Sequence, residues 1–444
     1  MSSSKILRAG SMPAAGCDEY RTLDQKGISR RTFLKSVAGG GALMLTNSLF
    51  PGLPFVAFAQ TPREVDTLVV VFLRGGMDSM SAVVPVGEGA RFYDRRNVTG
   101  IPESSVLDLD GFFGFHPSLA PLHEIYQGGR LAVIHAAGSP DPSRSHFDAM
   151  EYMERGTPGV RVTETGWLTR HLQSVPWTND SPFRALAMAP TLPTSLQGPE
   201  PALALDSLEG FDLNVPDHYR SELERGLRDL YRGHRSNAAF DREADSLFST
   251  MRELRRLSSA GGGKGGGNGG NGAPGYPETG FGYSLRQVAQ LIKADVGLEI
   301  ACIDLGGWDT HEDQGGVEGQ FANLLNELAT GLAAFHHDLE DRADRLTVVT
   351  MSEFGRQLVE NASGGTDHGR GGSMLVMGGG VRGGVHGVWP SLAPDALDDG
   401  DLAITTDFRD VLSEILVQRM RNSAVEQVFP GYRANYRGIM RPGA

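Results

Sequence analysis

Six short and largely apolar runs recur along the chain, the first of them continuous, and they constrain its fold more than any other feature. They lie at residues 67–74, 130–137, 185–190, 298–305, 346–352 and 373–378. A run of this length without polar interruption predicts a strand that is buried on both faces. Between the fourth and fifth runs, apolar residues recur every three or four positions from Phe321 to Leu339, which predicts a helix. The alternation predicts an α/β fold, with a mostly parallel central sheet and helices on both faces.

Residues 214–277 depart from this alternation. Two helical patterns lie within residues 214–258, and we interpret them as a helical insertion. The following residues, 259–277, are dominated by glycine and predict a flexible loop. Because no second alternating pattern follows, we expect residues 60–444 to form one α/β domain that carries this insertion.

The first 59 residues have the composition of an export signal. Residues 29–35 read SRRTFLK, an uncharged run extends to Phe58, and the sequence AFA at residues 57–59 offers a cleavage site before Gln60. This pattern predicts a twin-arginine signal and therefore the twin-arginine export machinery as a partner. A membrane anchor is the alternative, but the small residues and two prolines of the run favour cleavage. We expect a periplasmic or secreted protein with no membrane attachment after cleavage.

Charge and cysteine content narrow the possible partners. The whole chain has a net charge of −13, and the leader contains seven basic and three acidic residues, which leaves the rest near −17. A nucleic-acid partner is disfavoured, because Lys and Arg would have to neutralise its phosphates. Cys17 lies in the leader, so Cys302 has no partner for a disulfide, and its apolar surroundings predict a buried structural thiol.

Polar residues follow several of the predicted strands, at the edge where open parallel sheets bind ligands. Asp78 follows the first strand and is either a metal ligand or a helix N-cap. Ser143, Arg144 and Ser145 follow the second strand and precede a helical pattern. A helix N-terminus favours an oxyanion or a phosphate, so either serine is a candidate nucleophile, and either could be the cap instead.

The later loops are rich in carboxylates and imidazoles flanked by glycine. Asp309 and His311 follow the fourth strand, and this pair of side chains suits Zn²⁺ or Mn²⁺, although a solvated loop is the alternative. Glu353 follows the fifth strand directly, and Asp367 and His368 lie in GGTDHGRGG, residues 364–372. Taken jointly, the candidate ligands predict a site for two metals: Asp78, Asp309, His311, Asp367, His368 and His386.

Five motifs resemble a known family. They are LRGGMDSMS (73–81), SRSHFDAM (143–150), GGWDTH (306–311), SEFGR (352–356) and GGTDHGRGG (364–372). With them, the mature chain resembles the bacterial DUF1501 family. The order of its acidic, serine and histidine residues is also similar to that of the alkaline phosphatase, sulfatase and cofactor-independent phosphoglycerate mutase superfamily. The resemblance implies an alkaline-phosphatase-like fold.

The resemblance also implies roles for single residues. Ser145 would be the nucleophile, with Ser143 as the alternative, and Arg144 would stabilise the charge on the transferred group. Asp309, His311 and His386 would hold one metal, while Asp367 and His368 would be divided between the two metals or join Asp78 at the second. The divalent ions would be Zn or Mn, with Ca or Mg as alternatives.

Three departures from the superfamily pattern affect these roles. Asp309 and His311 are two residues apart, where the superfamily spacing is four. Asp367 and His368 lie fifteen residues beyond the fifth strand, and Glu353 occupies the strand tip, so Glu353 is a further candidate ligand. The segment PDPSR, residues 140–144, has proline where the nucleophile of a formylglycine sulfatase would lie, which disfavours that class.

Two functions are compatible with this pattern. One is an exported metal-dependent hydrolase of phosphate or sulfate esters, acting on a small molecule or a polysaccharide. The other is a non-catalytic exported binding protein on the same scaffold, which recognises a surface polysaccharide or a protein partner. Replacing Ser145 by alanine separates the two, because only the hydrolase needs the hydroxyl.

Overall fold

The computed structural model describes residues 66–441 except for the following: 162, 176–178, 180, 209, 211–214, 216, 233–248 and 257–274. All described residues belong to one compact unit, residues 54–444. The predicted signal at residues 1–59 and most of the glycine-rich segment lie outside the described residues. In the part of the chain that is described, no helix combines the length and the apolarity that crossing a bilayer would need.

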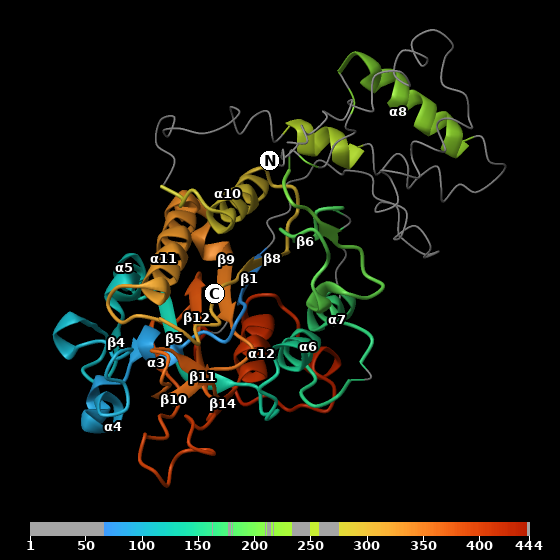
Figure 1. The fold of residues 1–444 in the computed structure, drawn as a ribbon. Helices are drawn as coiled ribbons and strands as arrows, with labels where there is room; N and C mark the ends of the chain where they lie inside the picture. The colour runs from blue at the N-terminus through green and yellow to red at the C-terminus, as the bar shows by residue number, and fades with distance from the viewer. Residues whose placement is uncertain are drawn as a thin grey trace, which may run out of the picture. The chain divides into compact units, whose positions relative to one another are not determined.

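A central sheet organises the described residues (Figure 1). Its strand order is β13 (Gly384–His386), β5 (Leu131–Gly138), β12 (Gly372–Gly378), β9 (Leu346–Met351), β1 (Thr67–Leu73), β8 (Ile300–Leu305), β6 (Ala185–Ala187) and β7 (Leu203–Ala204), and β14 (Thr406–Asp407) also pairs with β5. The six apolar runs of the sequence are therefore all strands. Every pairing is parallel except those of β12, which runs antiparallel to β5 and β9. The predicted α/β class with a mostly parallel sheet is confirmed.

Strand β1 shows why a continuous apolar run suits this position. All seven of its residues are buried. Val69, Val71 and Leu73 belong to one hydrophobic cluster, whereas the alternate residues from Leu68 to Phe72 belong to a second cluster. Because successive side chains of a strand point to opposite faces, a strand between two helical layers needs apolar residues at every position.

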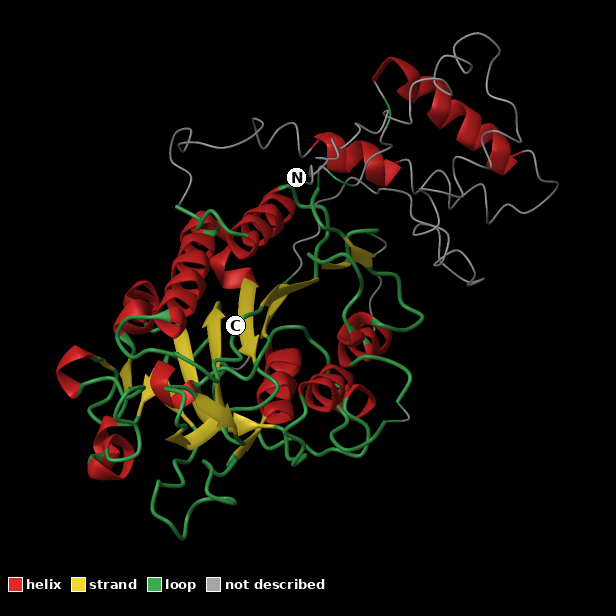
Figure 2. Cartoon of the chain, in the orientation of Figure 1, coloured by secondary structure: helices red, strands yellow, loops and turns green. Residues whose placement is uncertain are grey.

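Helices cover the two faces (Figure 2). The first cluster receives side chains from α5 (Ala120–Gln127), α10 (Gly280–Lys293) and α11 (Gln320–Asp338). The second receives them from α6 (His146–Arg155), α7 (Trp167–Ser174) and α12 (Phe408–Gln418). The predicted helix from Phe321 onward is α11, and its apolar positions face the first cluster. The sheet is thus buried between two helical layers, and its strand ends remain available for polar residues.

The remaining elements are mostly short. They are α3 (Ser79–Ala82), α4 (Ala90–Tyr93), α13 (Val425–Val428), the 3-10 helices η1 (Val86–Glu88), η2 (Glu103–Ser105), η3 (Pro117–Leu119), η4 (Thr194–Leu196) and η5 (Glu340–Arg345), a small sheet of β2 (Val83–Val84), β4 (Gly114–Phe115) and β3 (Leu107–Asp108), and the hairpin of β10 (Arg356–Glu360) and β11 (Thr366–His368). Within the predicted helical insertion, α8 (Asp217–Arg232) and residues 249–256 are helical.

Candidate metal centre

Loops from distant parts of the sequence meet at one edge of the sheet. Strands β1, β8 and β9 are parallel, so the residues that follow them emerge at this edge. Strand β12 runs in the opposite direction, so the segment that precedes it, residues 364–372, arrives at the same edge. In the β10–β11 hairpin, Arg356 pairs with His368. The hairpin therefore brings His368 back beside Arg356, close to the end of β9. The fifteen-residue separation of Asp367 and His368 from the strand is therefore spanned by a hairpin.

Three imidazoles surround the Asp309 carboxylate. The Asp309 Oδ1 atom lies 3.0 Å from the Nε2 of His311, 3.1 Å from that of His368 and 3.4 Å from that of His146. The Nε2 atoms of His311 and His368 are 2.9 Å apart. His146, Asp309 and His368 each offer a donor atom, and these atoms all lie within 4.8 Å of one another. Four possible metal ligands thus converge on one region.

An oxygen atom lies next to the Nδ1 atom of each imidazole and determines which ring nitrogen carries the hydrogen. The Nδ1 atoms lie 2.7 Å from Glu353 Oε1 for His146, 2.8 Å from Asp367 Oδ1 for His311 and 2.8 Å from the Arg144 carbonyl oxygen for His368. Carbonyl and carboxylate oxygens only accept hydrogen bonds, so each Nδ1 carries the hydrogen. A neutral imidazole then has its lone pair on Nε2. Ligating histidines in proteins are held in this way.

Asp309 Oδ1 accepts a hydrogen bond from Arg356, whereas the Nε2 lone pairs of the three imidazoles face no hydrogen-bond donor among the described residues. Three Nε2 lone pairs and one carboxylate oxygen face one another, and no hydrogen of the imidazoles lies between them. Three nitrogens and one oxygen are donors that Zn²⁺ accepts in tetrahedral sites. The residues present therefore fit a divalent ion of the zinc type. Among the described residues, one group of three candidate ligands has all its donor atoms within 4.8 Å of one another, namely His146, Asp309 and His368. His311 adjoins this group through His368 and Asp309. The sequence predicted two metals.

Arg356 holds the loops of the site together. Its guanidinium is fully buried and donates to the carbonyl oxygens of Gly76 and Trp308, in two different loops, and of Thr366 at the start of β11. It also donates to Asp309 Oδ1 at 2.6 Å. Partial burial by itself would raise the pKa of Asp309, but the hydrogen bond and the positive charge of Arg356 outweigh it and lower the pKa. Asp309 is therefore ionised at neutral pH.

Glu353 and Asp367 lie behind the imidazoles. Glu353 is buried, accepts a hydrogen bond from the Gly75 backbone N–H at 2.8 Å, and faces His146. Asp367 accepts hydrogen bonds from His311 and from the Asn361 side chain, which lower its pKa. The structure thus places Glu353 and Asp367 as hydrogen-bond partners of His146 and His311, on the side away from the donor group.

Two further residues proposed as ligands lie outside the donor group. Asp78 is fully buried in an ion pair with Arg96, and its side chain makes no capping bond at α3, although it occupies the N-cap position. His386 lies on the edge strand β13, opposite Ile134 in the middle of β5, and its Nε2 contacts the Arg382 carbonyl oxygen at 2.8 Å. The strand position keeps His386 away from the sheet edge where the donors meet.

The serine loop meets the site at the start of α6. Ser145 is the N-cap residue; its hydroxyl is exposed and makes no capping hydrogen bond. The Ser143 Oγ atom instead accepts a hydrogen bond from the Ser145 backbone N–H at 3.2 Å. The Arg144 guanidinium binds Asp401 at 2.6 Å, and only the carbonyl oxygen of Arg144 contacts the cluster, through His368.

Sequence reasoning did not select His146, Arg356 or Asn361. His146 lies within the motif SRSHFDAM and directly follows Ser145, and this proximity was the available signal. Arg356 likewise lay within the motif SEFGR. Asn361 had no signal in the sequence, because only the hairpin brings its side chain to Asp367 and to the His311 carbonyl oxygen.

The fold and the site together define an open, mostly parallel α/β protein with a histidine–carboxylate group at the carboxyl edge of its sheet. A family model described as "Protein of unknown function (DUF1501)" matches residues 114–424, and the chain belongs to this family. This match confirms the resemblance to the family and includes four of the five motifs, while LRGGMDSMS at residues 73–81 lies before the matched residues. Among curated proteins, no sequence matches the chain.

Several solved structures resemble the chain weakly. The C-terminal periplasmic domain of EcEptC from Escherichia coli, in complex with Zn, is 9% identical, with 74% of this chain and 77% of that chain covered and a TM-score of 0.32. The lipoteichoic acid synthase LtaP from Listeria monocytogenes is 11% identical, with coverages of 77% and 74% and a TM-score of 0.29. The alkaline phosphatase from the Antarctic bacterium TAB5 is 8% identical, with coverages of 71% and 93% and a TM-score of 0.26. At TM-scores this low, the similarities carry no conclusion about activity or ligands.

Proposed function

We propose that the protein is a metal-dependent hydrolase of phosphate or sulfate esters, with Ser145 as the nucleophile. The observation that carries the proposal is the convergence of three imidazole lone pairs and the Asp309 carboxylate. A divalent ion held there would supply a Lewis acid for an ester oxygen. His146, one of the converging imidazoles, directly follows Ser145 in the chain, so the candidate nucleophile and the candidate ligands share one helix start.

The local structure favours Ser145 over Ser143 as the nucleophile. The Ser143 hydroxyl is engaged by a backbone N–H, whereas the Ser145 hydroxyl is exposed and makes no capping bond. The free N–H groups at the start of the ten-residue helix α6 favour an anionic group beside Ser145. In the first step, Ser145 Oγ would bond to phosphorus or sulfur while the ester bond breaks, and the serine proton would leave with the departing alkoxide. Water would then hydrolyse the seryl ester.

A role for Arg144 in stabilising the transferred group needs a rearrangement. Its guanidinium binds Asp401 at 2.6 Å and Asp399 at 3.4 Å. For it to contact a substrate at Ser145, it would have to leave these carboxylates. If an Arg144→Met variant keeps full turnover, the Arg144 side chain has no role in the reaction. The proposal for the metal group would be unaffected by this result.

Metal analysis of four proteins tests the proposal. Protein purified without chelator should contain a divalent metal, and a panel of phosphate and sulfate esters should reveal turnover. We expect His368→Ala to lose both metal and turnover, and Ser145→Ala to lose turnover alone. His386→Ala is the matched control, since this histidine lies outside the donor group and should keep both. Metal-free wild-type protein without turnover would refute the proposal, and metal-loaded protein that turns over no ester would favour the binding-protein alternative.

Export through the twin-arginine pathway is part of the same proposal. Its support is the SRRTFLK sequence at residues 29–35 and the uncharged run after it. Replacing Arg30 and Arg31 with lysine in the full chain should retain the protein in the cytoplasm of an expressing bacterium. Unchanged secretion of this variant would contradict the pathway while leaving the metal group untouched.

A further inference from the structure

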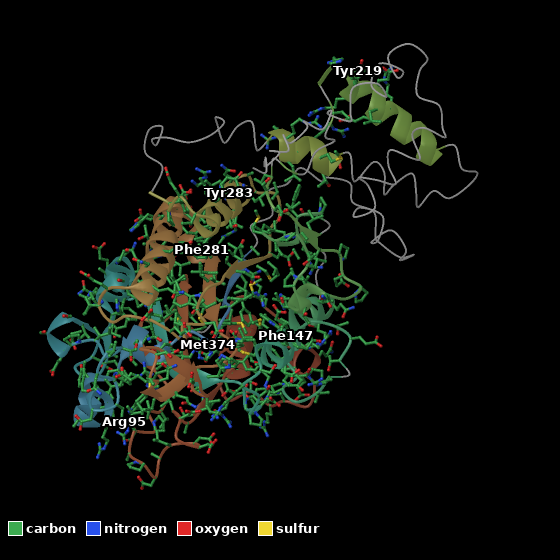
Figure 3. The ribbon with its side chains drawn as sticks, in the orientation of Figure 1. Arg95, Phe147, Tyr219, Phe281, Tyr283 and Met374 are labelled. Carbon is green, nitrogen blue, oxygen red and sulfur yellow. The ribbon has the colours of Figure 1, made fainter. Side chains whose placement is uncertain are left out.

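Helix α6 has a second face that the metal group does not use. His146 reaches the donor group, and Ala149 and Met153 are buried. Residues 147, 148, 151 and 152 follow the spacing of one helix face, turned away from the first. They line a hollow of about 340 Å³ together with Arg161, which we call the Phe147 hollow. Figure 3 labels Phe147 beside α6, and its side chain is 90% exposed.

The lining of the Phe147 hollow combines one aromatic ring with several hydrogen-bonding groups. Asp148 Oδ1 accepts from the Arg161 guanidinium at 2.8 Å, and Glu151 Oε1 accepts from Arg155 at 2.5 Å. Arg161 also donates to the Tyr152 hydroxyl oxygen at 3.1 Å. Because each carboxylate already faces a guanidinium, the hollow has little unpaired negative charge with which to attract a cation. Asp148 Oδ2 makes no hydrogen bond among the described residues, and it remains open to a hydroxyl donor.

The side chains that line the Phe147 hollow determine which class of ligand it can bind. A purely apolar ligand would cover charged side chains without replacing their hydrogen bonds to water, which is unfavourable. A sugar ring has an apolar face of C–H groups that suits Phe147, and hydroxyls at its edge that can donate to the carboxylates. The hollow is also at the lower end of the volumes typical of small-molecule sites, about 300–1,000 Å³.

We propose that the Phe147 hollow is a subsite for the sugar ring of a carbohydrate ester whose ester group lies at Ser145. The link to the ester rests on the proposed hydrolase function. Asp148 lies three residues beyond Ser145 on the same helix, a rise of about 4.5 Å along its axis. A hexose ester with its phosphate or sulfate group at the start of α6 can therefore extend its ring over Asp148 into the Phe147 hollow.

Relative turnover of two kinds of ester tests the subsite on the full metal-loaded chain. The probes are the 6-phosphates of glucose, galactose and N-acetylglucosamine, each compared with ethyl phosphate, or the matching sulfates if sulfate esters are the ones turned over. For the best sugar, we expect Phe147→Ala to lower the ratio of kcat/KM, sugar ester over ethyl ester, about fivefold, as loss of one ring contact predicts. Phe147→Trp should restore the ratio. Val388→Ala, another exposed apolar side chain, is the control and should not change it.

Direct binding separates the subsite from the proposed hydrolase function. The methyl β-glycosides of the same three sugars would be titrated against wild type, Ser145→Ala and Phe147→Ala, with binding followed by ligand-observed NMR. Binding that survives in Ser145→Ala and weakens about fivefold in Phe147→Ala supports the subsite even if no ester is hydrolysed, in which case only the hydrolase proposal fails. Ester turnover with a ratio insensitive to Phe147→Ala overturns the subsite alone, and no turnover with no glycoside binding overturns both.

Discussion

The buried pair of Asp78 and Arg96 gives a prediction that distinguishes a structural role of Asp78 from a metal-binding one. Both side chains are fully buried. Burial alone would raise the pKa of Asp78, but the charge and hydrogen bond of Arg96, with further bonds from Gln314 and Ser81, lower it overall. Arg96 also donates to the Leu358 carbonyl oxygen at 2.9 Å. Removing the guanidinium would therefore leave a buried carboxylate without its cation.

The loss of stability in Arg96→Met can be estimated from the least unfavourable change available to the Asp78 carboxylate. In Arg96→Met, Asp78 can take up a proton, which at pH 7 costs about 4 kcal/mol for a group with an ordinary pKa of 3.8. This agrees with the cost of breaking a buried ion pair by removing one partner, about 3–5 kcal/mol. The cost should shrink by about 1.4 kcal/mol for each unit that the pH falls, to about 2 kcal/mol at pH 5.

The stability of the wild type and that of Arg96→Met change in opposite directions as the pH falls. In wild type the pKa of Asp78 is lowered on folding, so its stabilisation is present above pH 3.8 and is lost as the pH falls below that value. In Arg96→Met the pKa of Asp78 is raised on folding, so the folded variant regains stability as the pH falls from 7 towards 4. The free energies of unfolding of the two proteins therefore converge in acid.

Urea denaturation followed by circular dichroism at pH 7 and pH 5, with chelator present, measures this difference. Arg91→Met is the control, because Arg91 is exposed and its buried partner Glu88 keeps hydrogen bonds from Trp389 and Leu392, so the loss should cost less than about 1 kcal/mol. An Arg96→Met variant as stable as the control at pH 7 would refute the reasoning. If Asp78→Asn also lost bound metal, Asp78 would be a ligand and not a structural carboxylate.

Three further predictions concern single side chains. Asn361→Ala should weaken metal binding about tenfold in a chelator competition titration, because Asn361 orients the Asp367 carboxylate that holds His311, and unchanged affinity would exclude this positioning role. Burial lowers the pKa of His171 to about 3, so wild-type stability should fall relative to His171→Asn as the pH decreases from 6.5 towards 3, and parallel urea midpoints would contradict this. Burial raises the pKa of Cys302, so native protein should resist iodoacetamide at pH 8 and react only after unfolding.

The strands were predictable because their signal is local. A strand covered on both faces must be apolar at every position, and the runs that became β1, β5 and β9 are buried throughout. The same pattern does not encode direction, so the antiparallel orientation of β12 could not be read from it. That orientation decides that residues 364–372 arrive at the carboxyl edge of the other strands.

The candidate site was predictable only in part. Asp309, His311 and His368 were selected from their residue types and glycine-rich surroundings, and the structure brings them together. His146 was missed because its sequence context is that of an ordinary helix start. Asp78 was selected for the same reasons as Asp309, yet a partner distant in sequence, Arg96, pairs with it in the interior. Residue type alone cannot distinguish a carboxylate in a candidate metal site from one in a buried ion pair.

The sequence by itself determined the alternation of strands and helices and the loops in which candidate metal-binding side chains occur, because both depend on residues that are close together in the chain. It also determined the acidic charge, which depends on composition alone. The tertiary structure alone decided which nitrogen of each imidazole faces the site. That choice depends on oxygens from Glu353, Asp367 and the Arg144 backbone, which lie between 56 and 224 residues away from the histidines they hold. Hydrogen-bond partners so remote in sequence meet only in the folded protein, and they orient three separate histidines as one group of candidate ligands.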